Sequence, residues 1–326
     1  MFLSLNQLQT KIQKQPLKLT DSLEKEYNLL IEKINQKEKK AVKRGVIIPN
    51  PEILNREGGD ATLVNNPYLA SVHFGNYLAV REIIKSLVLK RANLFKLRIL
   101  GIGEGSGVFA YFLASELKPK IYLATDYQKW LVNYGQAVFS GGLLRFSQLD
   151  ATKMDSIPNN SFDVIIACEF IEHISPESLL IFLQECRRVL KDNGVVITTT
   201  PNRSCHPGKK FSGYPSHFTE FTAQELHSFI EKNLQGMYVS HLIFHLFNEK
   251  MCQEKQKRFI FEQATNYLSR GFLKLFPEAF LNKLLGFLYK KGRQKLSFPK
   301  EYGRTKLVYK PEDETKAFGL CLVLQT

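Results

Sequence analysis

The 326-residue sequence has no apolar run of the roughly 18–20 residues that a membrane-spanning helix requires, so an integral membrane protein is not expected. Its N-terminus lacks the charged and then apolar layout of a secretory signal. The five cysteines are scattered and form no C-x-x-C pair, which argues against a cysteine zinc site and a disulfide framework. Free thiols and a cytoplasmic location are therefore expected.

Acidic residues are the scarcer charges: 31 Asp and Glu stand against 45 Lys and Arg, a formal net charge of +14. This balance favours an anionic partner, such as nucleic acid, acidic lipid headgroups or a phosphorylated substrate. Residues 241–310 hold 15 Lys and Arg against 5 Asp and Glu, so much of the basic surplus lies there.

From Leu97 onward, short apolar runs alternate with helical segments. This alternation predicts an α/β fold with a mostly parallel sheet and helices on both faces. The helices include Val108–Leu117 and Ser178–Leu190. The expected strands are Arg98–Ile102, Ile121–Thr125, Leu144–Leu149, Asp163–Cys168, Val195–Thr200, Met237–Phe244 and Phe318–Leu324.

Four parts are expected along the chain. Residues 1–69 form a helical N-terminal extension, in which a charged helix over Leu19–Arg44 packs on the domain that follows. Residues 70–245 form the core that binds a ligand, and residues 317–326 supply its last strand. Residues 246–316 form a basic helical insertion or cap, which ends in a loop over Lys295–Pro311.

The most informative run is R-I-L-G-I-G-E-G-S-G over residues 98–107, which ends a strand and opens a helix. Gly103, Gly105 and Gly107 permit positive φ angles, so that a ligand can lie against bare backbone. The unpaired N–H groups of the following helix suit an anionic or carboxylate-bearing ligand. The spacing fits neither the dinucleotide fingerprint G-x-G-x-x-G nor a P-loop.

Two acids follow the next two strands. Asp126 can accept hydrogen bonds from both hydroxyls of a ribose, and Asp150 can accept one from an adenine amino group. Alternatively, either residue is a loop or helix cap. Because the carboxyl ends of strands in an open α/β sheet line one crevice, the three strand ends together predict a nucleoside site.

These motifs, with Phe162–Cys168, Glu169–His173 and Thr199–Asn202, resemble the class I S-adenosylmethionine-dependent methyltransferases of bacterial small-molecule and cell-envelope type. The resemblance covers roughly residues 70–245 and the last strand. It implies a Rossmann-like, doubly wound, mostly parallel seven-stranded sheet with an antiparallel last strand, and S-adenosylmethionine as cofactor. By this resemblance the cofactor-binding residues are Gly103, Glu104, Gly105, Gly107, Asp126, Tyr127, Asp150, Ala151 and Cys168.

One departure concerns Gly101, where the family usually has Asp or Glu in contact with the cofactor's amino-acid end. Glu104 lies near enough in the sequence to substitute for it.

Candidate catalytic residues are His173, His217 and Glu172, because transfer to a hydroxyl is helped by a general base. No metal is expected on this interpretation. In the alternative, Glu169, Glu172, His173 and His217 bind magnesium or manganese, since the Glu-x-x-Glu-His pattern is also similar to small-RNA terminal ribose methyltransferases. A third interpretation gives His173 only a structural role.

The leading functional prediction is O-methylation of a small-molecule, saccharide or lipid-linked acceptor. Its basis is the run from Pro201 to Glu225, which is similar to bacterial methyltransferases acting on sugars or lipids of surface polymers. The alternatives are metal-assisted RNA ribose methylation and a non-catalytic scaffold that binds the cofactor. The basic insertion is expected to be a helical cap, a peripheral contact with the inner membrane face or a nucleic-acid clamp. The absence of a compact Arg/Lys–aromatic motif disfavours the clamp.

Overall fold

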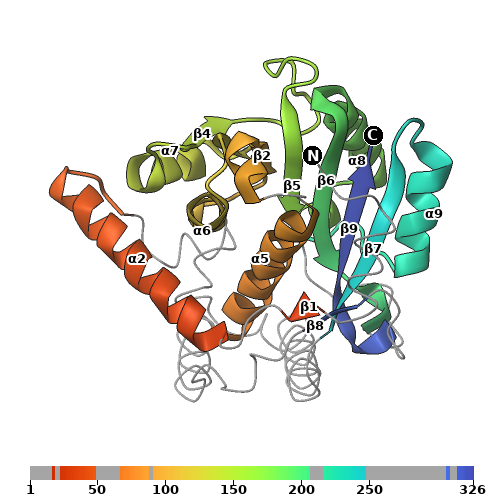
Figure 1. Cartoon of the computed structure of the whole chain (residues 1–326), viewed down its shortest axis with the longest axis horizontal. Helices are drawn as coiled ribbons and strands as arrows, with labels where there is room; N and C mark the ends of the chain where they lie inside the picture. Colours follow the sequence, from red (N-terminus) through yellow and green to blue (C-terminus); the bar gives the residue numbers. More distant parts are fainter. Residues whose placement is uncertain are drawn as a thin grey trace, which may run out of the picture.

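The computed structural model describes residues 17–18, 23–48, 67–87, 91–205, 216–246, 306–308 and 314–326, which form one nine-stranded sheet flanked by helices (Figure 1). The seven longer strands are β2 (Arg98–Ile102), β3 (Ile121–Asp126), β4 (Leu144–Gln148), β5 (Phe162–Cys168), β6 (Leu190–Pro201), β7 (Tyr238–Leu246) and β9 (Ala317–Gln325). The two short strands are β1 (Leu17–Lys18) and β8 (Lys306–Val308). The α-helices are α2 (Leu23–Lys43), α5 (Pro67–Leu87), α6 (Val108–Leu117), α7 (Lys129–Phe139), α8 (Pro176–Val189) and α9 (Ala223–Asn233). The 3-10 turns are η1 (Arg91–Lys96), η2 (Ile171–His173), η3 (Arg203–Cys205) and η6 (Glu314–Lys316).

The strand order is β1-β8-β7-β9-β6-β5-β2-β3-β4. Strands β2 to β6 run parallel, and β9 is antiparallel to both of its neighbours, β6 and β7. This arrangement confirms the mostly parallel sheet with an antiparallel last strand. The count of seven strands is wrong, because β1 and β8 extend the sheet beyond β7. The loop expected over Lys295–Pro311 is wrong at β8, whose three residues pair with the end of β7.

Each central strand buries alternate residues in two different cores, as the two-residue period of a strand requires. In β5, Val164 and Ile166 belong to a core shared with α2, α5, α6 and α7. Ile165 and Ala167 point to a second core, which α8 and α9 cover. Because β5 is buried in every residue, it reads as a continuous apolar run, as expected of a central parallel strand.

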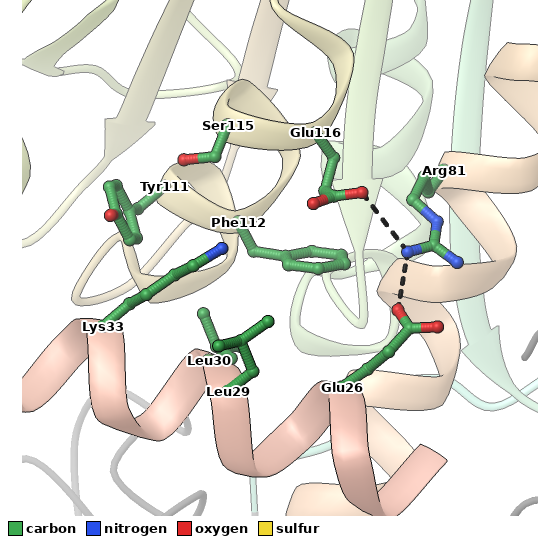
Figure 2. A pocket seen from close by; sticks show the side chains of 9 residues that line it. All are labelled: Glu26, Leu29, Leu30, Lys33, Arg81, Tyr111, Phe112, Ser115 and Glu116. Atoms are coloured by element: carbon green, nitrogen blue, oxygen red, sulfur yellow. Dashed lines mark hydrogen bonds and ion pairs between the residues drawn. The ribbon is translucent and has the colours of Figure 1, made fainter. Parts of the chain in front are cut away.

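The N-terminal helix α2 packs on the core, as predicted. Tyr27, Leu30 and Ile34 are buried, and the Tyr27 ring meets that of Phe74 edge-on at 5.9 Å between centroids. Figure 2 shows how Arg81 of α5 reaches Glu26 of α2 and Glu116 of α6. The Arg81–Glu26 contact is 2.7 Å, and Arg81 is buried. Helix α2 is therefore fixed by both apolar and ionic contacts.

A cavity of about 240 Å³ lies beside these contacts, between α2, α5 and α6 (Figure 2). None of the predicted site residues lines it. Its lining consists of Glu26, Leu29, Leu30, Lys33, Arg81, Tyr111, Phe112, Ser115 and Glu116.

Most of the predicted insertion over 246–316 lies outside the described residues, as does much of the extension over 1–69. The helical character of the insertion, its basic surface and its division from the core therefore stay predictions. Within the described ranges, no helix is both long and apolar enough to cross a bilayer.

Candidate functional site

The glycine loop joins β2 to α6 and is bonded to the neighbouring strand β3. The N–H of Glu104 donates to the Thr125 carbonyl at 3.0 Å, and the Thr125 hydroxyl donates to the Gly101 carbonyl at 2.7 Å. Gly103 has a φ of 64°, and a Cβ there would lie 2.7 Å from the Phe170 ring. Bare backbone is therefore required at this turn for conformational and steric reasons.

Asp126, at the end of β3, touches the glycine loop directly. Its Oδ2 accepts a hydrogen bond from the Gly105 N–H at 2.9 Å, and its Oδ1 accepts one from the Gln128 N–H at 2.9 Å. Burial raises the pKa of Asp126, while these backbone donors oppose the rise. The predicted meeting of Asp126 with the turn is thus observed, and the carboxylate has lone pairs left for a ligand.

Asp150 lies two residues after β4, at the same edge of the sheet. Its Oδ1 accepts hydrogen bonds from the N–H and the hydroxyl of Thr152, at 2.8 and 2.7 Å. These bonds make Asp150 a loop cap, which is the alternative to a ligand role that the sequence left open for this residue. Tyr127 is 71% exposed beside Asp126, and Ala151 is partly buried. Their contacts to a cofactor remain predictions.

Glu104 is buried in the loop at 3% exposure. Its Oε1 accepts the Tyr122 hydroxyl at 2.5 Å, whereas no described group is a hydrogen-bond partner of Oε2. Burial raises the pKa of Glu104 to about 8, an effect that the Tyr122 bond opposes and the charge of Asp126 reinforces. Cys168, at the end of β5, is also buried, and burial raises its pKa well above the ordinary thiol range.

The chain leaves β5 through a sharp turn at Glu169, a non-glycine residue with a φ of 48°. Its N–H donates to the Thr199 carbonyl at 2.9 Å, and its carboxylate accepts from the Thr199 hydroxyl at 3.0 Å. Phe170 follows and packs against Gly103. The turn that leads into η2 is therefore in contact with the glycine loop.

Glu172 is almost fully buried in η2, and its Oε2 accepts the Thr200 hydroxyl at 3.1 Å. Burial raises the pKa of Glu172 well above its ordinary range, and the nearby carboxylates of Glu169 and Glu220 add to this. The Glu172 carbonyl also accepts the Phe218 N–H at 2.8 Å. The segment around His217 is therefore held against η2.

The two predicted histidines lie together, with ring centroids 4.9 Å apart. The Nδ1 of His173 lies 3.0 Å from the Ser216 carbonyl, and the Nδ1 of His217 lies 2.5 Å from a carboxylate oxygen of Glu220. Partial burial lowers the pKa of His173, and the neighbouring His217 lowers it further. The buried Glu220 is thus a functional candidate that was not predicted, although it stands three residues after His217.

His73 of α5 is a second residue that was not predicted. Burial lowers its pKa to about 4, and the charge of His173 contributes to that fall. Its proximity to η2 depends on how α5 packs, and no sequence pattern around His73 indicates it.

Three of the four residues of the alternative metal set converge. Glu172, His173 and His217 each offer a ligand atom, and these atoms lie within 4.8 Å of one another. Among the residues that the structure describes, Glu169 is not part of this group. Oxygen and imidazole ligands suit a divalent cation, so the group could hold one.

The site therefore has two sides in contact through Phe170 and Gly103. We call the loop 103–107, which includes Glu104, together with Asp126 the glycine side. We call the group formed by Glu172, His173, His217, Glu220 and His73 the histidine side. The glycine side offers bare backbone, a carboxylate for a ribose and an unsatisfied buried acid, which fits the nucleoside and amino-acid ends of S-adenosylmethionine. The histidine side offers groups that can take up a proton.

A family profile described as a methyltransferase domain matches residues 100–198, which include the glycine loop, Asp126 and η2. A "Probable S-adenosylmethionine-dependent methyltransferase" of Mycolicibacterium smegmatis is 31% identical over 134 residues, covering 41% of this chain and 49% of that protein. A "Ubiquinone biosynthesis O-methyltransferase" of Rickettsia typhi is 30% identical over 146 residues, covering 41% of this chain and 52% of that protein. The chain thus spans about half the length of these relatives.

Among solved structures, a "SAM dependent methyltransferase" from Archaeoglobus fulgidus matches with a TM-score of 0.42 at 16% identity, covering 76% of this chain and 94% of that one. The profile match and the relatives both point to a methyltransferase domain. Residues 100–198 therefore form a methyltransferase domain similar to that of S-adenosylmethionine-dependent methyltransferases.

Proposed function

We propose that this protein transfers a methyl group from S-adenosylmethionine to a hydroxyl oxygen of a small-molecule acceptor. When bound, the cofactor supplies a methyl group on a positively charged sulfur. The chain's own task is to align the acceptor, exclude water and take up the hydroxyl proton. The observation that carries the proposal is the contact between the glycine side and the turn that leads to His173, made through Gly103 and Phe170.

His217 is the general base in this proposal. Its Nδ1 lies 2.5 Å from the buried carboxylate of Glu220, so the carboxylate accepts a hydrogen bond from the Nδ1–H and orients the ring. Such a pair leaves Nε2 as the basic nitrogen and stabilises the imidazolium that forms when the proton is taken up. Glu220 is then a positioning residue rather than a catalytic one.

His173 positions the acceptor. A carbonyl oxygen can only accept a hydrogen bond, so the 3.0 Å contact with Ser216 fixes the ring proton on Nδ1. The lowered pKa keeps this ring neutral near pH 7. Its Nε2 is therefore an acceptor, suited to receive a hydrogen bond from an acceptor hydroxyl.

The names of the relatives support a small-molecule acceptor. Besides the R. typhi protein, a "Demethylmenaquinone methyltransferase" of Bacteroides fragilis is 33% identical over 113 residues. A saccharide or lipid-linked acceptor and peripheral contact with an anionic membrane extend this proposal. Their support is the basic surplus over residues 241–310.

A transfer assay tests the proposal. The full chain is incubated with methyl-labelled cofactor and with cell extracts separated into small-molecule, lipid and RNA pools. We expect label in the small-molecule or lipid pool, on oxygen, and none with His217→Ala. A protein that binds cofactor but labels no pool would be a scaffold. Label on nitrogen or carbon would overturn the hydroxyl acceptor.

A second candidate function is favoured by the convergence of Glu172, His173 and His217 within 4.8 Å. In this reading these three residues would hold a divalent cation, which would supply Lewis-acid polarisation of the acceptor hydroxyl, and the ribose of RNA would be the acceptor. The two readings compete for the same imidazoles. A chelator separates them: metal assistance predicts loss of transfer with chelator and recovery with manganese, whereas the imidazole base predicts neither.

A further inference from the structure

Glu104 is a buried acid with one oxygen left unsatisfied. It is 3% exposed, and its Oε1 accepts the Tyr122 hydroxyl at 2.5 Å. No hydrogen-bond donor for Oε2 is found anywhere in the described ranges. Because native proteins rarely bury a polar atom without a hydrogen-bond partner, Oε2 indicates a partner that arrives with a ligand.

Within the part of the chain that the structure describes, the titratable groups that face Glu104 provide no counter-charge. They are Tyr122 on β3, Asp126 at the end of β3 and Cys168 at the end of β5. Burial keeps the phenol of Tyr122 and the thiol of Cys168 neutral by raising their pKa values well above the ordinary range. Asp126 is an acid, and its charge adds to the burial that raises the pKa of Glu104 to about 8. This corner of the site is thus suited to a cation with N–H donors.

Gly101 explains why the acid is found at position 104. A Cβ on Gly101 would lie 2.1 Å from Oε1 of Glu104 and 2.7 Å from its Cδ. The carboxyl group of Glu104 therefore fills the space into which a side chain at the end of β2 would project. An acid at either position can occupy this space, but acids at both positions would collide.

We propose that Glu104 binds the α-ammonium group of the cofactor's methionine end, in the space left by Gly101. The ammonium, rather than the sulfonium, is the partner because only the ammonium carries N–H donors for Oε2. Glu104 is neutral before binding and ionises against the ammonium, so its proton passes to solvent. The inference rests on the cofactor site of the proposed function.

Two ligands test the contact on the full chain. S-adenosylhomocysteine carries the ammonium group, whereas 5′-methylthioadenosine shares the adenosine and the sulfur but lacks the amino-acid end. For Glu104→Gln, we expect the dissociation constant of the first ligand to rise roughly 10- to 100-fold, as for a lost charge-assisted hydrogen bond. The dissociation constant of the second ligand should change less than about twofold.

Other outcomes are separable. Equal weakening of both ligands would mean that Glu104 only shapes the loop, and no weakening would mean that it makes no contact; either result overturns the inference. If the unsubstituted protein bound neither ligand, the proposed function itself would fail.

Moving the acid from position 104 to position 101 tests whether side chains at the two positions occupy the same space. Glu104→Ala alone and Gly101→Asp alone should both bind S-adenosylhomocysteine poorly, the second because its side chain meets Glu104. The double variant should recover at least about tenfold over Glu104→Ala, since one buried acid is restored. Thermal unfolding confirms that each variant is folded. A folded double variant without recovery would contradict the shared-space argument.

Proton release gives a readout that is independent of affinity. Calorimetry at pH 7 in two buffers of different ionisation enthalpy should show about one proton released per S-adenosylhomocysteine bound. Glu104→Gln should lose this release, and 5′-methylthioadenosine should not produce it. Equal proton release by both ligands would overturn the ionisation of Glu104.

Discussion

The glycine side and the histidine side are built from different parts of the protein. On the glycine side, backbone groups and strand ends do most of the positioning, as in the 2.9 Å bond from Gly105 to Asp126. On the histidine side, side chains from distant segments act together: His173 in η2 lies beside His217, which precedes α9, and the charge of His173 lowers the pKa of His73 on α5. The first should respond to substitution through cofactor affinity, and the second through turnover.

The largest expected effect is on the histidine side. His217→Ala should lower kcat by roughly 10²- to 10⁴-fold, because the proposed base is lost. The dissociation constant of S-adenosylhomocysteine should stay within about twofold of the unsubstituted protein's. Steady-state kinetics and calorimetry check the two halves of this prediction. A comparable loss of cofactor affinity would break the division between the two sides.

The reciprocal change is on the glycine side. Asp126→Ala removes the acceptor for the Gly105 N–H and the proposed ribose contact, so cofactor affinity should fall roughly 10- to 100-fold. At saturating cofactor, kcat should recover to near its normal value. Asp155→Ala is the matched control, because Asp155 is an exposed acid outside the glycine side that pairs with Lys153. If the control weakened binding as much as Asp126→Ala, the loss could not be assigned to the glycine side.

A smaller effect is expected from the residue behind the base. Glu220→Gln keeps an oxygen near His217 Nδ1 but removes the charge, so kcat should fall about 10-fold while cofactor affinity is kept. An unchanged kcat with reduced thermal stability would indicate a purely structural role for Glu220.

The sequence predicted the glycine side better than the histidine side for a physical reason. Strand β2 and helix α6 have the predicted bounds, because a local apolar run and the glycines that end it determine both. Asp126 could be predicted in the same way, because it stands at the end of the next strand along the chain. Local patterns carry this information, and the parallel sheet then brings the strand ends to one edge.

Tertiary packing decides the parts that were missed. His73 reaches the site only because α5 packs over the sheet, and a lone histidine within an apolar helix gives no sign of this. Likewise, β8 has only three residues, which is too short for the two-residue alternation of a strand to be recognised in the sequence. It is a strand because it pairs with β7. Three of the four residues of the alternative metal set lie close together, since Glu172 and His173 are adjacent and Phe218 bonds to Glu172, while metal binding itself stays a prediction.

His73 on the histidine side and Glu104 on the glycine side should change the stability of the fold in opposite directions as the pH changes. His73 has a pKa of about 4 when folded and an ordinary value of 6.5, so the unfolded chain binds its proton first and stability falls as pH drops from 6.5 towards 4. Glu104 has a pKa of about 8 when folded and an ordinary value of 4.5, so stability falls as pH rises from 4.5 towards 8. Each slope is at most about 1.4 kcal/mol per pH unit, because one proton is involved.

Urea unfolding at pH 5, 6.5 and 8 measures the fall in stability at acid pH (the acid limb) and at alkaline pH (the alkaline limb), because these pH values lie within the two ranges given above. His73→Asn should flatten the acid limb and leave the alkaline limb, while Glu104→Gln should do the reverse. Part of each pH dependence should remain in the single variants, because the pKa of His173 is also lowered and that of Glu172 is also raised. If both variants flattened the same limb, the histidine and glycine sides would be one coupled electrostatic unit, and the division between them would not hold.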